Sequence, residues 1–591
     1  MNSSGGEYKR IISSICNAVS GFCEFLGEQF RSSALNSAIE RVGLGTRSIE
    51  LRRKCVRAIE KTTVAKAYSG LVSNMLSASS RVYGTFLLTF GLYILLIFLV
   101  KRFAFSEMGE DQSDVILACG LILAGLPIFI IDRSISTLLR SSKITSYLLT
   151  KVFAVRGATL KPCEKTGVGY VASLILGLLC GSLTIFFSPL TIFLILVVVL
   201  TAMLVLASPE SGVALLFMLL PFLDTLPLLF AVIIVLLSLS WKVLSLKRTL
   251  HFKAIDYTVL VFSFLVLVFG TLSFRMSDGF KNSMILLVFV LSYFAVTQLV
   301  VNNETFYCCI RSFLLGNLIT SLITILQFVS SIDHVPYSKY IIINFTPEYS
   351  VVMLIVIALP LMLGRMQYAS SKLMAATAFL LTTAALVLCP PDSYWFVAII
   401  TFFVAVFTVS KKGFLVVLFI TLASVAAGNF FLPESIRATV IDSLLQMIEP
   451  YKAYFNASYA TYTHLFEGVG YGDVSFNFST VMLDPTTVQK PISSLSYLLS
   501  SGGVVTALSY LSILVGVIMN TMTSLHRGIK RKMKTIIKML SCALFAMLLE
   551  STCRNYQGGN TLTLMFWLVL GLTVAGNNCL DKEDSVNSYM A

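Results

Sequence analysis

Charged side chains are scarce in this 591-residue sequence: Asp, Glu, Lys and Arg make up 13% of it, whereas hydrophobic residues make up 56%. A soluble protein of this length would divide into several domains with polar surfaces. The short alternating pattern of strands in a membrane barrel is also missing. With a mean hydropathy of +0.85, the sequence predicts an all-α polytopic integral membrane protein.

The twelve cysteines and four histidines form no metal-binding motif. No C-x-x-C pair occurs, and no Cys/His cluster has the spacing of zinc ligands. Most cysteines lie in apolar stretches, where cysteine behaves as a small hydrophobic residue. We therefore expect no metal and no cofactor. Residues 1–81 also lack the apolar core of a signal peptide, so the first apolar segment is expected to direct insertion.

Apolar runs long enough to cross the hydrocarbon core of a bilayer recur along most of the chain. About sixteen segments have this character, and Pro221, Asp224 and Pro227 divide one run into a short pair that could be re-entrant. The segments are 83–101, 114–131, 168–187, 190–207, 211–223, 225–241, 255–274, 283–301, 309–329, 350–364, 373–389, 394–410, 413–429, 495–520, 535–552 and 561–576.

Basic residues gather in every second loop between these segments. The loop 132–167 has seven Lys or Arg, and residues 1–81 have twelve against six acidic residues. Since Lys and Arg favour cytoplasmic loops, we expect a multi-pass protein of the cytoplasmic membrane with both termini in the cytoplasm. This pattern also accounts for the net charge of +14. No basic domain with interleaved aromatic residues points to nucleic-acid binding.

The N-terminal region 1–81 and the loop 430–494 are the two long polar parts. Apolar residues at helical spacing in the first part, with Lys and Arg between them, favour an amphipathic cytoplasmic region on anionic lipid; a partner-binding segment is the alternative. The loop is expected on the outer side. Its aromatic residues recur at helical intervals, as in a face against the bilayer or in a stacking surface for sugars. They are Tyr451, Tyr454, Phe455, Tyr459, Tyr462 and Phe466.

A glycine-rich turn, Gly468-Val469-Gly470-Tyr471-Gly472, follows these aromatic residues. Alternate glycines permit a tight turn and close approach of the backbone to a ligand, although a simple turn is the alternative. The turn follows no strand, so it is not a dinucleotide-binding fingerprint.

Several short motifs together resemble the O-antigen ligase/polymerase family of bacterial envelope glycosyl-transfer proteins. They are the outer loop with its glycine turn, the helix start Ser496-Tyr497-Leu498-Leu499-Ser500-Ser501-Gly502-Gly503-Val504-Val505, the segment Met565-Phe566-Trp567-Leu568-Val569-Leu570-Gly571-Leu572, and Ser208-Pro209-Glu210-Ser211-Gly212-Val213-Ala214-Leu215-Leu216 before Pro221-Phe222. The resemblance covers 205–580. It implies a family-like core of about twelve helices there, preceded by extra transmembrane helices in 82–204 and followed by a cytoplasmic tail, 581–591.

The resemblance implies transfer of a glycan from a polyprenyl pyrophosphate to an acceptor hydroxyl on a glycan, lipid or protein, at the outer face of the cytoplasmic membrane. Arginines would neutralise the pyrophosphate, and histidine is the expected base. The sequence departs from the family pattern at two places. Asp392-Ser393-Tyr394 lacks the arginine that usually follows the serine, and Lys490-Pro491-Ile492-Ser493 lacks the usual histidine.

Other residues on the predicted outer side can take these roles. His464, beside Glu467, is the candidate base, although a solvated histidine without a role is the alternative. The candidate substrate-binding residues are Arg275, Lys452, Lys490, Arg554, Gly468, Gly470, Gly472 and Tyr471. Arg554 is also expected to pair with Glu550, four residues earlier.

Two other functions fit the composition, so enzymatic activity is left open. A non-catalytic membrane scaffold would not need the missing arginine and histidine. A transporter of a lipid-linked or small substrate would need ionisable residues deep within the spans, and very few occur there. The sequence does not define the oligomeric state.

Overall fold

The computed structural model describes residues 78–104, 112–155, 169–244, 250, 252–273, 276–330, 349–369, 371–389, 392–431, 441–442, 445, 468, 470–471, 493–527 and 531–590. Helices account for nearly all of these residues. They are α5 (Ser80–Ala104), α6 (Gln112–Ile130), α7 (Ile135–Ser141), α8 (Lys143–Tyr147), the π-helical stretch η1 (Leu148–Val152), α9 (Tyr170–Leu183), α10 (Pro189–Ala207), α11 (Pro209–Leu219), α12 (Thr225–Leu244), α13 (Ala254–Thr271), α14 (Met276–Leu299), α15 (Asn303–Ser330), α16 (Tyr349–Met366), α17 (Lys372–Val387), α18 (Ser393–Val409), α19 (Lys411–Phe431), α22 (Ser494–Arg527), α23 (Arg531–Glu550) and α24 (Thr561–Met590).

The helices confirm an all-α membrane protein. In the described part of the chain, nine of them are long and apolar enough to cross a bilayer. Each of the sixteen apolar segments expected from the sequence overlaps one helix, because a backbone inside lipid must satisfy its own hydrogen bonds. The proposed short pair becomes α11, with eleven residues, and the longer α12. Sixteen crossings remain a prediction.

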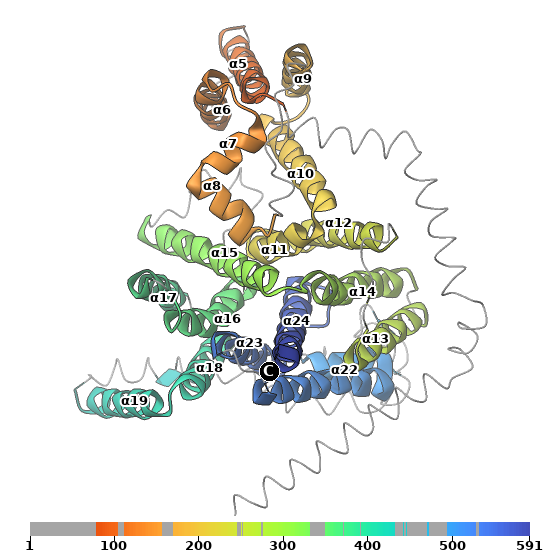
Figure 1. Ribbon diagram of the computed structural model, residues 1–591, viewed down its shortest axis with the longest axis vertical. Coiled ribbons are helices and arrows are strands. Elements are labelled where there is room, and N and C mark those ends of the chain that lie inside the picture. Colours follow the sequence, from red (N-terminus) through yellow and green to blue (C-terminus); the bar gives the residue numbers. More distant parts are fainter. Residues whose placement is uncertain are drawn as a thin grey trace, which may run out of the picture.

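The buried apolar side chains form two separate clusters. The smaller one joins α5, α6, α9 and α10 through residues such as Phe90, Ile94, Leu121 and Ile192. The larger one extends from Val205 to Leu580 and includes most of the other helices. Figure 1 shows α5, α6 and α9 standing together, separated from the larger group by α7, α8 and α10. The predicted boundary near residue 204 falls between the clusters, and the division into domains remains a prediction.

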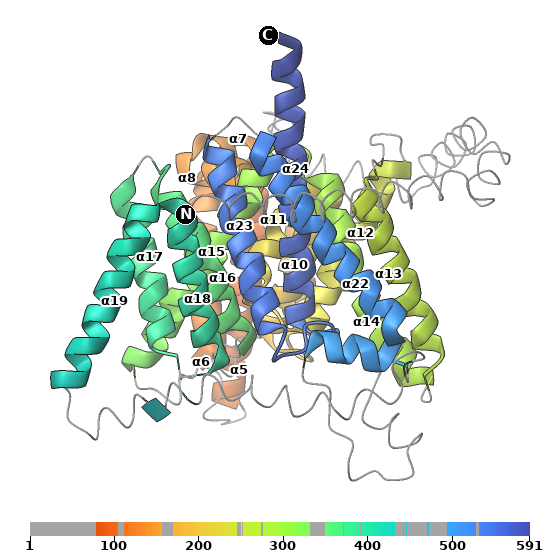
Figure 2. The same ribbon diagram turned by 90° about the horizontal axis from the view of Figure 1, so that it is seen from below.

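Helix α24 occupies the centre of the larger group (Figure 2). In its membrane-length window 94% of the residues are buried, against 17% for α10. Burial of polar side chains is favourable only where hydrogen bonds compensate for lost hydration, and some of the polar groups of α24 are paired. Asn577 Nδ2, for example, donates a hydrogen bond to Thr521 Oγ1 on α22 at 2.8 Å.

The bundle has two ends, which we name from what lies there. The tail end carries the C-terminal end of α24 together with α7 and α8 (Figure 2). There Lys253 lies 3.5 Å from Asp581. The loop end is opposite, where α19 ends and α22 begins. Thr561 is the first residue of α24 and Thr225 is the first residue of α12. Their hydroxyl oxygens lie 3.3 Å apart at that end.

Candidate functional site

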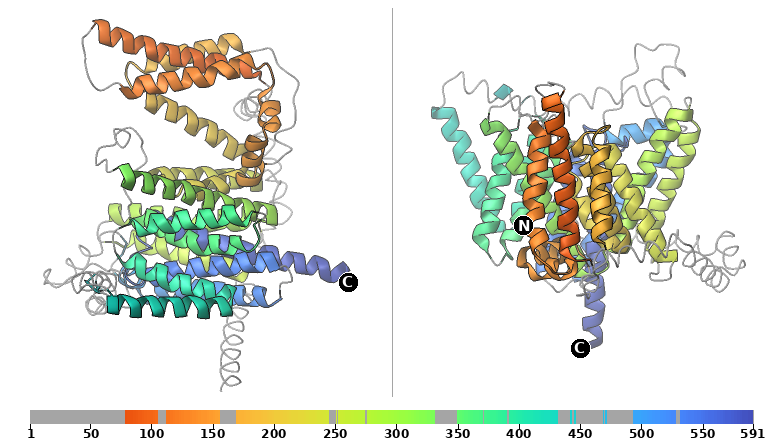
Figure 3. Two further views of the ribbon diagram at one scale, coloured as in Figure 1. Left: turned by 90° about the vertical axis from the view of Figure 1, so that its left-hand side faces the viewer. Right: turned by 90° about the horizontal axis from the view of Figure 1, so that it is seen from above.

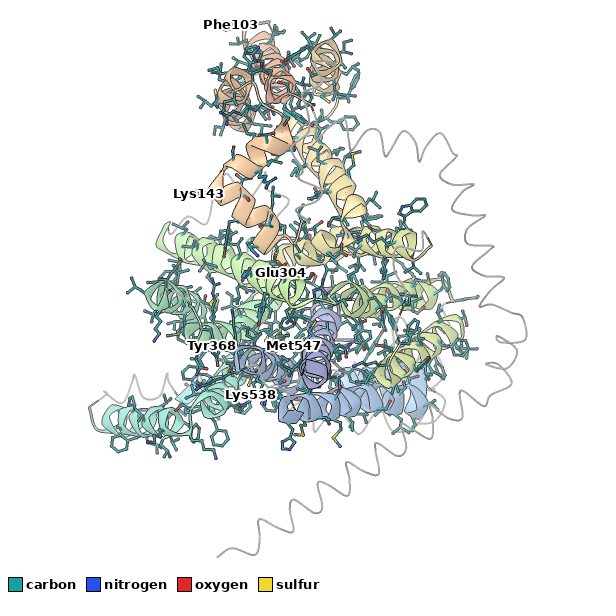
Figure 4. The ribbon with its side chains drawn as sticks, viewed as in Figure 1. Phe103, Lys143, Glu304, Tyr368, Lys538 and Met547 are labelled. Carbon is teal, nitrogen blue, oxygen red and sulfur yellow. The ribbon has the colours of Figure 1, made fainter. Side chains whose placement is uncertain are left out.

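A cluster of ionisable and hydroxyl side chains lies at the loop end of the larger group, where α16 and α18 begin and α23 ends. Met547, one turn before the end of α23, has no exposed surface, and Figure 4 shows it inside the bundle. The cluster therefore caps the end of a buried helix. Its members are Tyr349, Asp392, Ser393, Glu550 and Arg554.

Glu550 has a carboxylate side chain with 0% exposure. Ser393 Oγ donates a hydrogen bond to Glu550 Oε1 at 2.6 Å, and Cys553 Sγ lies 3.5 Å from the same oxygen. Arg554 Nε is 3.9 Å from it. Burial of a carboxylate is unfavourable unless hydrogen bonds and an opposite charge compensate for lost hydration. These contacts therefore hold Glu550 in the interior.

Arg554 forms the partly exposed side of the cluster. Its side chain is 38% exposed, and Nη2 donates to Asp392 Oδ2 at 2.9 Å. The guanidinium carbon lies 3.9 Å from the centre of the Tyr349 ring, a cation–π geometry. Nη1 contacts no carboxylate in the described part of the chain. Since a guanidinium has five N–H donors, this group can still bind an anion.

Local sequence explains why these groups meet. After α23 the chain makes one further helical turn, in which the Arg554 N–H donates to the Glu550 carbonyl at 2.9 Å. Residues four apart share a helix face, so the ion pair expected from the sequence is present. Asp392 is the N-cap of α18, and its carboxylate accepts the Ser393 N–H at 2.6 Å. The cap thus fixes the positions of Asp392 and Ser393 at the start of α18, and these residues contact Arg554 and Glu550 at the end of α23.

The first turn of α22 is attached to the same region. The Ser494 N–H donates to the Ser551 carbonyl at 3.0 Å. Ser494 Oγ accepts from the Tyr556 N–H at 2.8 Å and donates to the Arg554 carbonyl at 3.3 Å. The turn that carries Arg554 is therefore anchored through its backbone to a second helix, so Arg554 does not depend on its side-chain contacts alone for its position.

The described part of the glycine turn, residues 468 and 470–471, lies between the end of α13 and α22. We call this place the glycine seat. Gly468 and Gly470 have φ values of +64° and +85°, a region that favours glycine. The Gly470 N–H donates to the Ser501 carbonyl at 2.9 Å. A Cβ at Gly468 would lie 2.6 Å from the Gly503 nitrogen, and one at Gly470 would collide with Ser273. Protein backbone therefore occupies the space that these two glycines leave open.

Tyr471 is buried in the same seat. Its ring packs edge to face on Tyr497 with the ring centres 5.9 Å apart. Burial raises the pKa of the Tyr471 phenol far above its usual value, so the phenol stays neutral at physiological pH. Its role in substrate binding remains a prediction.

A small, shallow recess opens at the loop end. It is lined by the turn between α11 and α12, residues 220–224, together with Ser350, Val351 and Thr561. Ser350 directly follows Tyr349, the first residue of α16, and the Tyr349 ring stacks on Arg554. Its polar lining consists of the Asp224 carboxylate and the two hydroxyl groups.

The structure describes some of the residues that the sequence singled out. Arg554 lies in the cluster, whereas Gly468, Gly470 and Tyr471 lie in the separate glycine seat. The other candidates are outside the described residues. They are His464, Glu467, Arg275, Lys452, Lys490 and Gly472.

Sequence reasoning did not select Tyr349, Asp392 or Ser393 as site residues. Asp392 was recognised as an acidic residue in a predicted outer loop, and the serine of the family pattern was recognised at Ser393. An acidic residue directly before the family serine was therefore the sequence signal that could have identified this part of the site.

The described residues contain no group of three or more His, Cys, Asp or Glu side chains that could hold a metal ion. No family model matches the chain, and no curated protein matches it.

Proposed function

We propose that this chain transfers or polymerises a polyprenyl-pyrophosphate-linked glycan at the outer face of the cytoplasmic membrane, within cell-surface polysaccharide assembly. One observation carries the proposal. A partly exposed arginine, Arg554, is held at the loop end beside the buried pair of Glu550 and Ser393. A guanidinium so positioned suits a pyrophosphate, because its planar donors match phosphate oxygens.

The cluster also bears on the departure from the family pattern at Ser393. The resemblance implies an arginine next to that serine, and this sequence has Tyr394 instead. Ser393 Oγ and Arg554 Nε both approach Glu550 Oε1, at 2.6 Å and 3.9 Å. We propose that Arg554, which comes from a different helix end, supplies the missing guanidinium and that Glu550 positions it.

The proposed transfer breaks the bond between the anomeric carbon of the glycan and an oxygen of the pyrophosphate. The acceptor oxygen forms the new bond to that carbon, and the electron pair of the broken bond stays on the pyrophosphate. Arg554 would stabilise the added negative charge. The acceptor proton would pass to His464, supported by Glu467.

The remaining sequence candidates are proposed to bind the carrier. They are Arg275, Lys452, Lys490 and Gly472 as direct ligands, with Gly468, Gly470 and Tyr471 contributing by fixing the turn that precedes Gly472.

A non-catalytic scaffold is the second candidate, and the same cluster gives it a specific argument. Arg554 contacts Asp392, Glu550 and the Tyr349 ring, and such a set of contacts can serve solely to join helix ends. In that case the positive charge at residue 554 would matter for stability and not for glycan transfer.

The first test removes the protein from its native cell and restores it with Arg554→Lys. Lysine keeps the charge but loses the planar donors. We expect surface polysaccharide to fall at least about tenfold, the effect of losing roughly 1.4 kcal/mol of transition-state stabilisation, while polyprenyl-linked glycan accumulates. Arg81→Lys is the matched control, because Arg81 pairs with Asp132 at the tail end, 3.7 Å away, and is similarly exposed.

The outcomes separate the two functions. An unchanged glycan profile after complete removal of the protein would exclude transfer and favour a scaffold or a transporter. Full activity of Arg554→Lys, with loss of product on removal of the protein, would retain the transfer function but dismiss Arg554 as the pyrophosphate ligand.

A further inference from the structure

The helical segment α7–α8–η1 lies across the tail end of the bundle and crosses the direction of the long helices (Figure 3). Figure 3 (left) shows α7 and α8 running along the long axis of the molecule while the membrane-length helices lie across it. Figure 2 shows both short helices level with the ends of these long helices. In a membrane whose normal follows the long helices, this segment lies in the plane of the lipid headgroups.

The segment is fixed at its far end to the larger group of helices. Ser312 Oγ on α15 donates to the Val152 carbonyl at 2.7 Å, and Arg311 Nη1 donates to the Lys151 carbonyl at 3.0 Å. At its near end, the Ile135 N–H donates to the Ala78 carbonyl at 3.1 Å. The segment is therefore a defined part of the fold with backbone contacts at both ends.

Large apolar side chains and cations share the exposed side of this segment. Ile144 is 74% exposed and Tyr147 is 51% exposed. Lys143 lies four residues before Tyr147, so these side chains share one face of α8. Arg140, in the last turn of α7, is also exposed. Figure 4 labels Lys143 at the junction of the two short helices.

The neighbouring acidic groups do not neutralise these cations. Asp132 lies 3.7 Å from Arg81, and Glu304 lies 3.4 Å from Lys151. No carboxylate in the described ranges pairs with Arg140 or Lys143. The exposed face therefore combines two uncompensated positive charges with apolar surface.

We propose that α7–α8–η1 is an anionic phospholipid-binding segment. Arg140 and Lys143 contact the headgroup phosphates, and Ile144 and Tyr147 enter the adjoining acyl boundary. A soluble anion would use the cations but leave the apolar pair in water, whereas a lipid satisfies both. The predicted cytoplasmic side agrees with this partner, because anionic lipids give that leaflet its negative surface potential.

The test uses the full chain in nanodiscs that contain a photoactivatable phosphatidylglycerol or a matched phosphatidylcholine probe. Crosslinked peptides from 133–152 are quantified by mass spectrometry. We expect crosslinks from phosphatidylglycerol and few from phosphatidylcholine. The double variant Arg140→Gln/Lys143→Gln should lower the yield about tenfold, since each cation near an anionic surface contributes severalfold to lipid affinity.

The control is Lys411→Gln/Lys412→Gln, which removes the same charge from two exposed residues at the start of α19. This variant should keep the crosslinking of 133–152. Ile144→Ser/Tyr147→Ser should lower that yield while all cations remain. Equal yields from both lipid probes, or an unchanged yield in Arg140→Gln/Lys143→Gln, would overturn the proposal. Crosslinks to other helices in the same sample report whether each variant is folded.

Discussion

Glu550 and Glu210 show how this protein keeps carboxylates away from water. Glu550 accepts the Ser393 hydroxyl and lies near Arg554. Glu210, at the first turn of α11, lies 2.8 Å from Lys242, and the two side chains are 5% and 12% exposed. Removal of one member of such a pair leaves a buried charge without its partner. The stability of the protein should therefore depend on these few residues more than on its many exposed ions.

Replacement of Ser393 by alanine should lower the free energy of unfolding by about 1–3 kcal/mol, because Glu550 loses a buried hydrogen-bond donor. Chemical denaturation of the purified chain in one detergent measures this change. Ser512→Ala is the control, since Ser512 is exposed and its hydroxyl donates to Ser509 within its own helix. The control should change stability by less than about 0.5 kcal/mol. Equal effects of both substitutions would contradict the role assigned to Ser393.

Lys242→Met should lower the free energy of unfolding by about 3–5 kcal/mol, since it removes the cation that lies 2.8 Å from the buried Glu210 carboxylate. Lys151→Met removes an exposed pair in which the side chains are 50% and 86% exposed, so its effect should stay below about 1 kcal/mol. The same denaturation experiment compares the two variants. A smaller effect for Lys242→Met than for Lys151→Met would show that burial does not control these pairs.

At the scale of elements, α22 is the helix whose shape depends most on glycine. Gly503 interrupts it with φ +66° and ψ −174°, and the bend places Ser501 and Gly503 against the glycine turn. The serine-rich start of α22 is joined to the α23–α24 turn through Ser494. One bent helix therefore connects the glycine seat with the cluster around Arg554.

Gly470→Ala should lower the free energy of unfolding by about 2 kcal/mol or more, because the residue has positive φ and a Cβ would collide with Ser273. Gly120→Ala in α6 is the matched control, since no atom lies within 4 Å of the added Cβ. That control should raise stability by about 0.5–1 kcal/mol through helix propensity. Thermal unfolding of both variants in one detergent tests the difference, and a stable Gly470→Ala protein would disprove the tight seat.

The elements could be predicted well from the sequence because membrane thickness selects apolar runs of a fixed length. Their ends could not. Segment 561–576 is the first half of a helix that continues to Met590, because hydropathy reports the apolar part and not the polar extension. Helix α14 likewise begins at Met276 and not near 283. Such extensions depend on local capping and packing.

The candidate site was only partly predictable, for a different physical reason. The Glu550–Arg554 spacing is local, so the helix period predicts that pair. The contact between Ser393 and Glu550 joins residues 157 positions apart, and no local pattern encodes it. It arises from the packing of α18 against α23, which only the three-dimensional structure shows.

The whole molecule has a polarity from one end to the other. Lys143 is the first residue of α8, which lies at the tail end (Figure 2). Asp224 lies at the loop end, where it lines one recess with Thr561. The positive-inside rule predicts that the tail end faces the cytoplasm. This orientation decides whether the cluster around Arg554 meets substrates from outside the cell.

Single cysteines test this orientation. A membrane-impermeant maleimide added to intact cells should label Asp224→Cys, whereas Lys143→Cys should react only after permeabilisation. The wild-type chain measures the background labelling of the native cysteines, because those in the described residues form no disulfides. The reverse labelling pattern would place both termini outside the cytoplasm and would remove the basis for transfer at the outer face.

The glycine seat has a consequence for how the chain is made. Its three parts leave the ribosome in the order Ser273, Gly468–Tyr471 and Ser501–Gly503, so the turn is synthesised before the carbonyl that binds the Gly470 N–H exists. Until α22 has been translated, the turn has no complete place to dock. A chain that ends before residue 501 would lack this carbonyl, so synthesis of α22 must be completed before the turn can dock.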